Sequence, residues 1–417
     1  MALLLSGYAN ALKEVLGFIQ DNFPKETILL NAMKRDADAQ YINDEFVLPI
    51  WSTRHGGIAN LATDNSNVIS ASGRALTRGT VPVESVTGAF DISKLAIDAS
   101  SSAQGAVEQA LTAQAESLST DFARHLNRQA YGDGIGVVSK VRATGGSVGS
   151  GTIAVEYPDA NLDDGRSIDW YGTINGDISP TKYIHADAII GVGTGAAALG
   201  TVTSVTGTSV VVSGAVVTAA NDSIYLQDGS GLGAGSAEFL GVRAALSSST
   251  GTSTYAGVTR NTTSWTPKFG SSSEALSLSR MEGAYLKARE VGKASDKYAI
   301  FVNVTLYQKY GDLLTAMRRV VNSTELMGGW TGLEFAAGAG KVGVYLDYDV
   351  PDGEVVVLNL ETWKLCQVKD ISWMEDPASG ALLRLQNTIK YQAVLVWFAN
   401  VMCVAPAANA RETRKSN

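Results

Sequence analysis

The chain has 417 residues, a length that suits a sizeable hydrophobic core divided among two or three substructures. Its formal net charge is −8 and 18% of its residues are charged, which argues against a protein that grips nucleic acid by neutralising phosphates, because that mechanism needs clustered Lys and Arg. A container that encloses DNA without gripping it remains compatible with this charge. The 43 glycines favour many turns and extensive β-structure.

The cysteines and the hydropathy pattern indicate the compartment and exclude some classes of protein. Cys366 and Cys403 are far apart in apolar, strand-like contexts, so we expect buried thiols in a reducing compartment. Residues 188–221 carry no charge, but Gly, Ser and Thr interrupt them every few residues, which excludes a continuous membrane helix. Residues 1–7 lack the basic region and the long apolar run of a signal peptide.

The first 85 residues predict two short helical elements and a strand-edged excursion. Residues 7–19 have the pattern of an amphipathic helix, and residues 22–38 form a second element after a proline break. Residues 41–51 alternate as a half-buried strand does. A polar run over 52–85 follows, with its tip expected near 64–73. Because a two-stranded ribbon is marginal in water, it should rest on its own domain or on another subunit.

The longest regular element is predicted over residues 99–130. Apolar residues recur there at steps of three and four, which places one narrow stripe along a helix of roughly 40 Å. Residues 131–134 (YGDG) stop the helix. The stripe comprises Val107, Leu111, Ala115, Leu118, Phe122 and Leu126. A structural rod is one interpretation, and a plain core helix of an α+β enzyme is the other.

Composition changes abruptly over residues 135–269, which are rich in Gly, Thr, Ser, Val and Ala. Short segments at 201–205, 209–213, 215–218 and 222–226 read as strands separated by tight turns. We interpret the region as a β-rich module inserted between helical parts. A low-complexity linker is the alternative, which the alternation of Val, Ile and Thr disfavours.

The remainder predicts a mixed α/β layer followed by strands. Residues 274–292 and 305–321 are amphipathic helices, and residues 298–302 (YAIFV) form a buried strand between them. From residue 341 onward a succession of strands is expected. Residues 383–394 alternate, giving two distinct faces as in an antiparallel arm.

The usual catalytic constellations are missing. His55, His125 and His185 stand in unrelated contexts without the further ligands that a zinc site or a triad needs. The run at 338–341 (GAGK) lacks the spacing and the Ser or Thr of a phosphate-binding loop. The sequence therefore nominates no catalytic, cofactor-binding or metal-binding residue, and we expect neither an enzyme nor a cofactor.

The order of these elements resembles that of tailed-bacteriophage major capsid proteins of the Hong Kong 97 type, over most of the chain. Two short stretches of the sequence are similar as well. Residues 239–268 (FLGVRAALSSSTGTSTYAGVTRNTTSWTPK) resemble a passage with a Tyr-x-Gly-x-x-Arg pattern in many phage capsid sequences. The run YAIFVNVTLYQKYGDLL at 298–314 resembles the core of their axial domain.

The resemblance implies an α+β phage-capsid fold with a β-rich insertion. Its parts would be an N-terminal arm at 1–45, an E-loop at 46–85, a peripheral domain with the spine helix (about 99–130) at 86–134, β-rich peripheral strands with the probable inserted module at 135–268, an axial domain at 269–350, and C-terminal strands of both domains with a tail at 351–417. The Gly/Thr/Val-rich stretch from about 135 to 235 is larger than a minimal member needs.

The resemblance further implies a structural protein that self-assembles into the hexamers and pentamers of an icosahedral shell around double-stranded viral DNA. The expected location is the virion, after assembly in the host cytoplasm. Expected partners are other copies of the chain, a separate scaffolding protein, a portal and, where present, a decoration protein. Membranes are not expected. The residues nominated for contacts with acidic patches of adjacent subunits are Arg54, Arg74 and Arg78, which are otherwise solvated loop arginines.

Two other classes remain open. A β-rich virion fibre, adhesin or decoration protein would explain residues 135–265, but it leaves the long helix and the α/β layer without a purpose. A soluble enzyme would explain the helices, but it would need a cleft lined by perturbed acids, bases or metals. Assembly discriminates among these classes, because shells require self-association far beyond a 43.8 kDa monomer.

Overall fold

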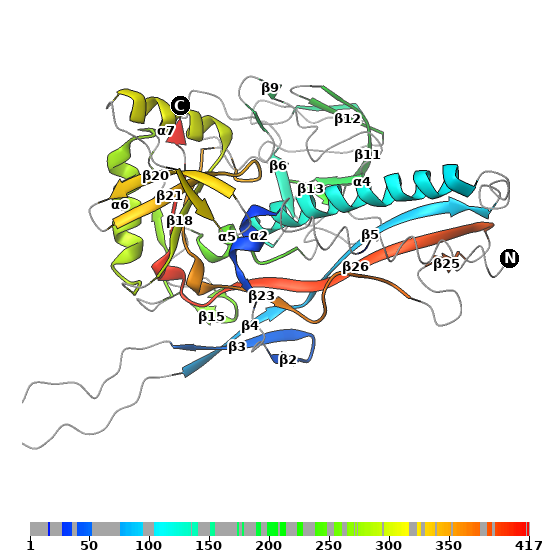
Figure 1. Cartoon of the computed structure of the whole chain (residues 1–417), viewed down its shortest axis with the longest axis horizontal. Helices are drawn as coiled ribbons and strands as arrows, with labels where there is room; N and C mark the ends of the chain where they lie inside the picture. The colour runs from blue at the N-terminus through cyan, green and yellow to red at the C-terminus, as the bar shows by residue number, and fades with distance from the viewer. Residues whose placement is uncertain are drawn as a thin grey trace, which may run out of the picture.

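The computed structural model describes the chain in separate segments. The described residues are 16, 27–35, 40–51, 76–94, 104–134, 136–140, 151–154, 173–174, 177–178, 189–192, 198–206, 209–213, 223–227, 238–247, 254–260, 265–270, 272, 274–293, 296–316, 323–326, 330–337, 340–351, 353–375, 382–385, 388–413 and 415–416. Figure 1 shows an elongated molecule, with a long helix lying along a ribbon of two long strands at one end and a sheet with two helices at the other.

The long helix, α4 (Gln104–Tyr131), lies along the strand ribbon formed by β5 (Glu84–Ser93) and β26 (Lys390–Cys403) (Figure 1). The two strands are antiparallel over ten residue pairs, from Lys390 opposite Ser93 to Ala399 opposite Glu84. β26 also pairs with β23 (Trp363–Gln367), β24 (Ser372–Trp373) and β25 (Leu382–Arg384), and β23 pairs in parallel with β1 (Lys34–Arg35). One strand therefore organises this six-stranded sheet.

The predicted apolar stripe of the helix faces this sheet wherever its side chains are described. Ala115, Phe122 and Leu126 are buried, and Leu118 packs against the same core. Gly88 of β5 makes room for them, because a Cβ at that position would lie 3.1 Å from Leu118 and 3.3 Å from Phe122. The backbones of Val107 and Leu111 lie in the helix, while their side chains are outside the described residues.

The described part of the predicted N-terminal arm includes a short buried helix. α2 (Ile28–Ala32) is buried within the chain's own core, and Leu29 is fully buried there. This segment of the predicted arm therefore packs on its own chain. The reason is its composition: ILLNA places a run of large apolar side chains against α4, and their burial is favourable.

A three-stranded antiparallel sheet follows: β2 (Gln40–Ile42), β3 (Glu45–Trp51) and β4 (Leu76–Pro82). The prediction of a single strand over 41–51 missed the turn at Asn43 and Asp44, both of which have positive φ. β3 and β4 pair from Glu45 opposite Pro82 to Trp51 opposite Leu76, so the predicted strand-edged excursion is confirmed at its base. The predicted tip at 64–73 lies outside the described residues.

The other end of the molecule is a seven-stranded mixed sheet with two helices, α6 (Leu278–Arg289) and α7 (Val304–Ala316) (Figure 1). The strand order is β16 (Lys268–Gly270), β27 (Ala410–Glu412), β22 (Val355–Asn359), β18 (Tyr298–Val302), β21 (Gly340–Leu346), β20 (Trp330–Ala337) and β19 (Ser323–Leu326). The mixed layer that the sequence predicts is present, and it recruits strands from the C-terminal segment.

The two faces of this sheet belong to two different cores. In β18, Ile300 and Val302 pack with the helix residues Met281, Tyr285, Leu306, Tyr310 and Leu314. Ala299 and Phe301, which alternate with them, belong to the core that also contains the α4 stripe. Because successive strand residues point to opposite faces, one fully apolar strand joins both cores. The sheet thus continues the packing of the long-helix region without a break.

The β-rich stretch contains a six-stranded antiparallel sheet. Its order is β6 (Val137–Lys140), β13 (Ser223–Gln227), β10 (Ile189–Val192), β11 (Ala198–Thr206), β12 (Ser209–Ser213) and β7 (Gly151–Ala154). A separate pair is formed by β8 (Thr173–Ile174) and β9 (Asp177–Ile178). The interpretation as a β-structured region is confirmed for these strands, and the predicted strand at 215–218 lies outside the described residues.

Short elements complete the fold. α5 (Val242–Ala245) follows the β-rich stretch, and the strand pairs β14 (Thr254–Tyr255) with β15 (Val258–Thr259) and β17 (Glu274–Ala275) with β28 (Lys415–Ser416) flank the main sheets. Two 3-10 turns lie at Leu360–Thr362 and Pro406–Ala408. Cys366 and Cys403 are both buried thiols, as the sequence predicts.

Candidate assembly interface

The three-stranded sheet β2–β3–β4 has one buried and one exposed face. On the inner face Phe46, Leu48 and Ile50 of β3 are buried together with Val81 of β4. The alternate residues point the other way, because side chains alternate across a strand. One face of the excursion is thus buried within the chain, and the other is exposed at Glu45, Pro49 and Arg78 but buried at Val47.

The inner face is fixed to the body by close packing and by backbone hydrogen bonds. The backbone of Gly79 lies against the side chains of Ile50 and Met402, so a Cβ there would overlap both. The Thr80 N–H donates to the carbonyl oxygen of Ala256 at 3.0 Å. Because two independent contacts hold β4, the base of the hairpin has a defined direction.

The turn between β2 and β3 is fixed as well. Asn43 and Asp44 have φ values of 52° and 61°, the region that two-residue hairpin turns of type I′ require and that Asn and Asp tolerate. The hydroxyl of Tyr41 donates to Asp44 Oδ1 at 2.5 Å, and the Asp44 carbonyl accepts from the Val83 N–H at 3.0 Å. Both contacts hold the short strand β2 beside the hairpin.

The outer side of this sheet exposes large apolar side chains. Leu76 is 58% exposed and Ile42 39% exposed on this side, whereas Tyr41, which is 52% exposed, lies opposite Phe46 and therefore on the inner side. Arg78 is exposed on β4, opposite Pro49 of β3. Arg54 and Arg74, which the sequence nominates with Arg78, lie outside the described residues. We name the set Ile42, Leu76 and Arg78 the hairpin face.

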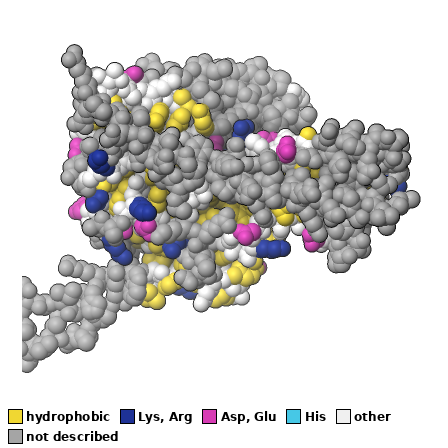
Figure 2. Space-filling view, viewed as in Figure 1, with side chains coloured by type: hydrophobic (Ala, Val, Ile, Leu, Met, Phe, Trp, Pro, Cys, Tyr) yellow, Lys and Arg dark blue, Asp and Glu magenta, His cyan; other side chains and the backbone are white. Residues whose placement is uncertain are grey.

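Charges elsewhere on the described surface are mixed. Figure 2 shows patches of hydrophobic side chains among scattered Lys, Arg, Asp and Glu side chains on one face of the molecule. Such interspersed charge suits contact with a surface of similar composition better than it suits a polyanion.

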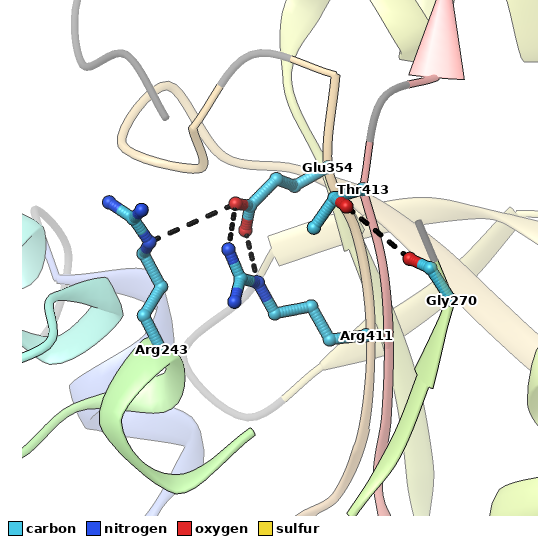
Figure 3. A network of polar contacts seen from close by, with 5 residues as sticks. All are labelled: Arg243, Gly270, Glu354, Arg411 and Thr413. Atoms are coloured by element: carbon cyan, nitrogen blue, oxygen red, sulfur yellow. Dashed lines mark hydrogen bonds and ion pairs between the residues drawn. The ribbon is translucent and has the colours of Figure 1, made fainter. Parts of the chain in front are cut away.

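Buried polar side chains join the long-helix region to the seven-stranded sheet. Glu354, just before β22, accepts from Arg411 of β27, with Arg411 Nε 2.8 Å from its Oε2 and Arg411 Nη2 closer to its Oε1. Arg243 of α5 approaches the same carboxylate, with its Nε 3.9 Å from Oε1 (Figure 3). Figure 3 places Glu354 between the two guanidinium groups, so one acid connects α5 with two strands of the sheet.

Two further polar contacts fix the last turns of α4. Arg128 pairs with Glu238, and both side chains are buried. Burial, together with the nearby charge of Glu238, raises the pKa of Glu84 to about 7. Asn127 lies one position before Arg128 and contacts Asp347 and Asp349 in the loop after β21. These groups position the long helix relative to the sheet.

The sequence analysis did not identify these buried polar residues at the joint between α4 and the seven-stranded sheet. A signal was available, because Asp347 and Asp349 interrupt the otherwise apolar run VGVYLDYDV, and a polar residue inside a buried strand context usually has a specific partner. The identity of the partners was not readable, since Asn127 is 220 positions away from Asp347.

Two absences concern the described part of the chain. Among those residues no group of three or more His, Cys, Asp or Glu side chains is placed to hold a metal ion. Within the same residues no helix combines the length and the apolar character needed to cross a membrane.

Comparisons with known proteins address the fold. No protein-family model matches the chain, and no curated protein matches it. Among solved structures it is similar to the cyanophage A-1(L) capsid asymmetric unit, with a TM-score of 0.51 and 11% identity over 95% of this chain and 94% of that chain. It is also similar to the capsid of an empty GTA particle (TM-score 0.41, 9% identity, 94% and 97% covered) and to a virus-like particle from Pyrococcus furiosus (0.40, 9%, 96% and 98%).

Of these three structures, the cyanophage capsid is the one whose TM-score exceeds 0.5, and the fold assignment rests on it. The likeness extends over nearly the whole of both chains, so it concerns the complete architecture rather than one shared sheet. The predicted α+β phage-capsid fold is therefore confirmed.

Proposed function

We propose that this chain is the major structural subunit of a tailed-phage capsid and that it is not an enzyme. Copies would assemble into hexamers and pentamers of an icosahedral shell that encloses double-stranded viral DNA. The observation that carries the proposal is the hairpin face, on a strand excursion anchored on its inner side, in a chain with the fold of a cyanophage capsid protein.

The geometry supports a subunit with a rigid body and a hairpin that binds neighbouring copies. The two cores share the strand β18, so the long-helix region and the seven-stranded sheet would move together. Burial of the hairpin face against a neighbouring copy would be favourable, because each large apolar side chain contributes roughly 1.5–3 kcal/mol when it passes from exposed to fully buried. Repeated around a ring, such a contact closes capsomers.

Charge supports the same role. A net charge of −8 suits enclosure of DNA without sequence-specific binding, since a shell that gripped phosphates would need clustered cations. Arg78, with Arg54 and Arg74, would pair with acidic side chains of an adjacent copy. Such pairs at the rim of an interface guide the encounter more than they strengthen it.

The family resemblance supplies the remaining proposals. Residues 1–45 would act as an arm, 46–85 as the E-loop, 99–130 as the spine of the peripheral domain and 269–350 as the body of the axial domain. The chain would reside in the virion after assembly in the host cytoplasm. Its partners would be a separate scaffolding protein, a portal and, in some shells, a decoration protein.

The test is assembly of the purified full-length chain, expressed alone and together with the neighbouring structural genes of its source. We expect capsomers or closed shells in negative-stain micrographs and sedimentation far beyond a 43.8 kDa monomer. A stable monomer under both conditions, with the hairpin face covered by its own chain, would overturn the proposal.

A β-rich virion fibre, adhesin or decoration protein is the second candidate, and the six-stranded sheet from β6 to β13 favours it. A decoration protein would bind shells made by another chain and would not form shells itself. The same micrographs therefore separate the two proposals.

A further inference from the structure

Asn127 of α4 lies where three separate parts of the chain meet. It is 1% exposed. Its Oδ1 accepts from the backbone N–H of Leu29 in α2 at 3.3 Å. Its Nδ2 donates to Asp347 at 3.1 and 3.2 Å and to Asp349 at 2.7 Å. The orientation of the amide is defined by its contacts, because only the oxygen can accept from Leu29 and only the nitrogen can donate to carboxylates.

The two acids are buried beside one another. Asp347 is 2% exposed and Asp349 is 6% exposed. Besides Asn127, Asp347 accepts from the hydroxyl of Tyr131 at 2.8 Å and from the backbone N–H of Asp349 at 3.0 Å. These contacts connect the end of α4 and the segment α2 to the loop that leaves the seven-stranded sheet.

The titratable and polar groups that face Asp347 in the described structure come from each neighbouring element. The helix α4 presents Asn127 and Tyr131, and the loop itself presents Asp349. All three hydrogen-bond donors to Asp347 are neutral. Burial and the neighbouring carboxylate of Asp349 raise the pKa of Asp347 to about 6, although the hydrogen bonds oppose the shift. The pair thus gains a proton under mildly acidic conditions.

We propose that Asp347 and Asp349 form a pH-sensitive lock between the long helix and the seven-stranded sheet. With one proton bound, the pair carries a single negative charge and accepts the donors of α4. When the proton leaves, Asp347 and Asp349 carry two buried negative charges beside one another, and their repulsion loosens the joint. The lock concerns the joint inside one chain and is independent of the proposed role in a shell.

The direction of the pH effect follows from the coupling between proton binding and folding. The folded chain holds the Asp347 proton with a pKa of about 6, above the ordinary value of 3.8, so folding is favoured when that proton is bound. The favourable contribution declines as pH rises from near 4 through 6 and is absent above that range. The joint should therefore open more readily at pH 8 than at pH 5.

Two backbone amides report directly on the joint. The N–H of Leu29 is bonded to Asn127 and the N–H of Asp349 is bonded to Asp347. Hydrogen exchange of the full-length chain is measured at pH 5 and pH 8 and corrected for the intrinsic rate. The N–H of Glu290 at the end of α6, bonded to the carbonyl of Leu286, serves as the reference for opening elsewhere.

We expect the two joint amides to lose about tenfold more protection than the reference between pH 5 and pH 8, since one pKa unit corresponds to a factor of about ten. Asp347→Asn keeps the shape and removes the titration, so this extra loss should vanish. Asp349→Asn should reduce it in part, because burial of Asp347 remains. Asp121→Asn, at an exposed position of α4, is the matched control and should behave as the wild type.

Equal protection of the joint amides at both pH values, relative to the reference, would overturn the proposal. So would an undiminished pH dependence in Asp347→Asn. If Asp347→Asn does not fold, Asp349→Asn decides the question, since it retains the titrating residue and removes the charge next to it. Because every readout is local to one chain, a failure of the lock is distinguishable from a failure to assemble.

Discussion

The long-helix region and the hairpin sheet β2–β3–β4 are both amphipathic, but they differ in how their apolar faces are used. The stripe of α4 is covered by β5 and β26 of the same chain, and Ala115 and Leu126 have no exposed surface. The hairpin sheet is covered on one side, while its other side exposes Leu76 by more than half and Ile42 by more than a third. The apolar face of the first region is buried within one chain, whereas one face of the second region stays exposed.

This difference separates what stabilises the subunit from what connects subunits. Substitutions in the long-helix region should change the free energy of unfolding of the isolated chain. Substitutions at the hairpin face should leave that free energy almost unchanged and should act on assembly. Each prediction below tests one side of this division.

The largest effect is expected for Phe122→Asp. The substitution removes a ring that is 5% exposed and places an unpaired carboxylate in the core, at a cost of at least about 4 kcal/mol in the free energy of unfolding. Urea denaturation followed by circular dichroism measures it. Arg124→Asp, on the exposed side of the same helix, should cost no more than about 0.5 kcal/mol. Normal shells from Phe122→Asp would mean that the stripe does not face the core.

Arg411→Met tests the buried contact with Glu354. Removing one partner leaves a buried carboxylate without its main donor, which should cost about 3 kcal/mol. Arg280→Met breaks an ion pair with Glu274 that is largely exposed, and should cost between about 0 and 1 kcal/mol. Chemical denaturation of both variants gives the comparison, and equal losses would show that burial does not set the value of these pairs.

Gly79→Ala tests how the hairpin is fixed to the body. The added methyl group overlaps the side chains of Ile50 and Met402, so we expect a loss of about 1–2 kcal/mol. Gly283→Ala is the matched control, because nothing lies within 4 Å of its Cβ position and Ala is the better helix former by up to about 1 kcal/mol. Melting temperatures should therefore move in opposite directions, and a shift in the same direction would contradict this packing.

Glu84→Gln tests the boundary between the two regions, where β4 gives way to β5. The pKa of Glu84 is raised to about 7, so its ionisation destabilises the fold progressively as pH rises from about 4.5 through 7. The neutral variant should be more stable than the wild type at pH 8, by up to about 3 kcal/mol, and equally stable at pH 4. Thermal unfolding at both pH values measures the difference, and a variant that is less stable at pH 8 would be inconsistent with a raised pKa.

Arg78→Glu should have the smallest effect on the isolated chain. Its side chain is exposed on the hairpin face, so the free energy of unfolding should change by no more than about 0.5 kcal/mol. Assembly should slow or stop, because the charge that faces an acidic neighbour is reversed. Light scattering during assembly measures the rate. If unfolding and assembly were both unaffected, Arg78 would be a solvated loop arginine.

The elements with strong periodicity were predictable from the sequence. The helix expected over 99–130 corresponds to α4, and the stripe residues Ala115, Phe122 and Leu126 are buried as the spacing predicts. The strand at 298–302 lies in the middle of its sheet because five successive apolar residues can satisfy two cores at once. In each case the local pattern and the tertiary environment agree.

Features that depend on distant contacts were not predictable. The burial of α2 and the joint around Asn127 arise from pairs far apart in the chain, and nothing in a local pattern identifies such partners. The turn at Asn43 and Asp44 was hidden inside an alternating run that reads as one strand. The assignment of Arg78 to an interface remains a prediction, because a single chain does not record what lies opposite its exposed face.

The most direct test asks what covers the hairpin face in the assembled state. A photoreactive amino acid is placed at position 76, and particles are assembled from an equal mixture of unlabelled and nitrogen-15-labelled chains before illumination. Mass spectrometry of the cross-linked peptides then distinguishes bonds within a chain from bonds between chains. We predict mixed-isotope pairs that join position 76 to a neighbouring copy. Cross-links confined to single-isotope pairs, in particles that have assembled normally, would show that the chain covers its own hairpin face and would contradict the account.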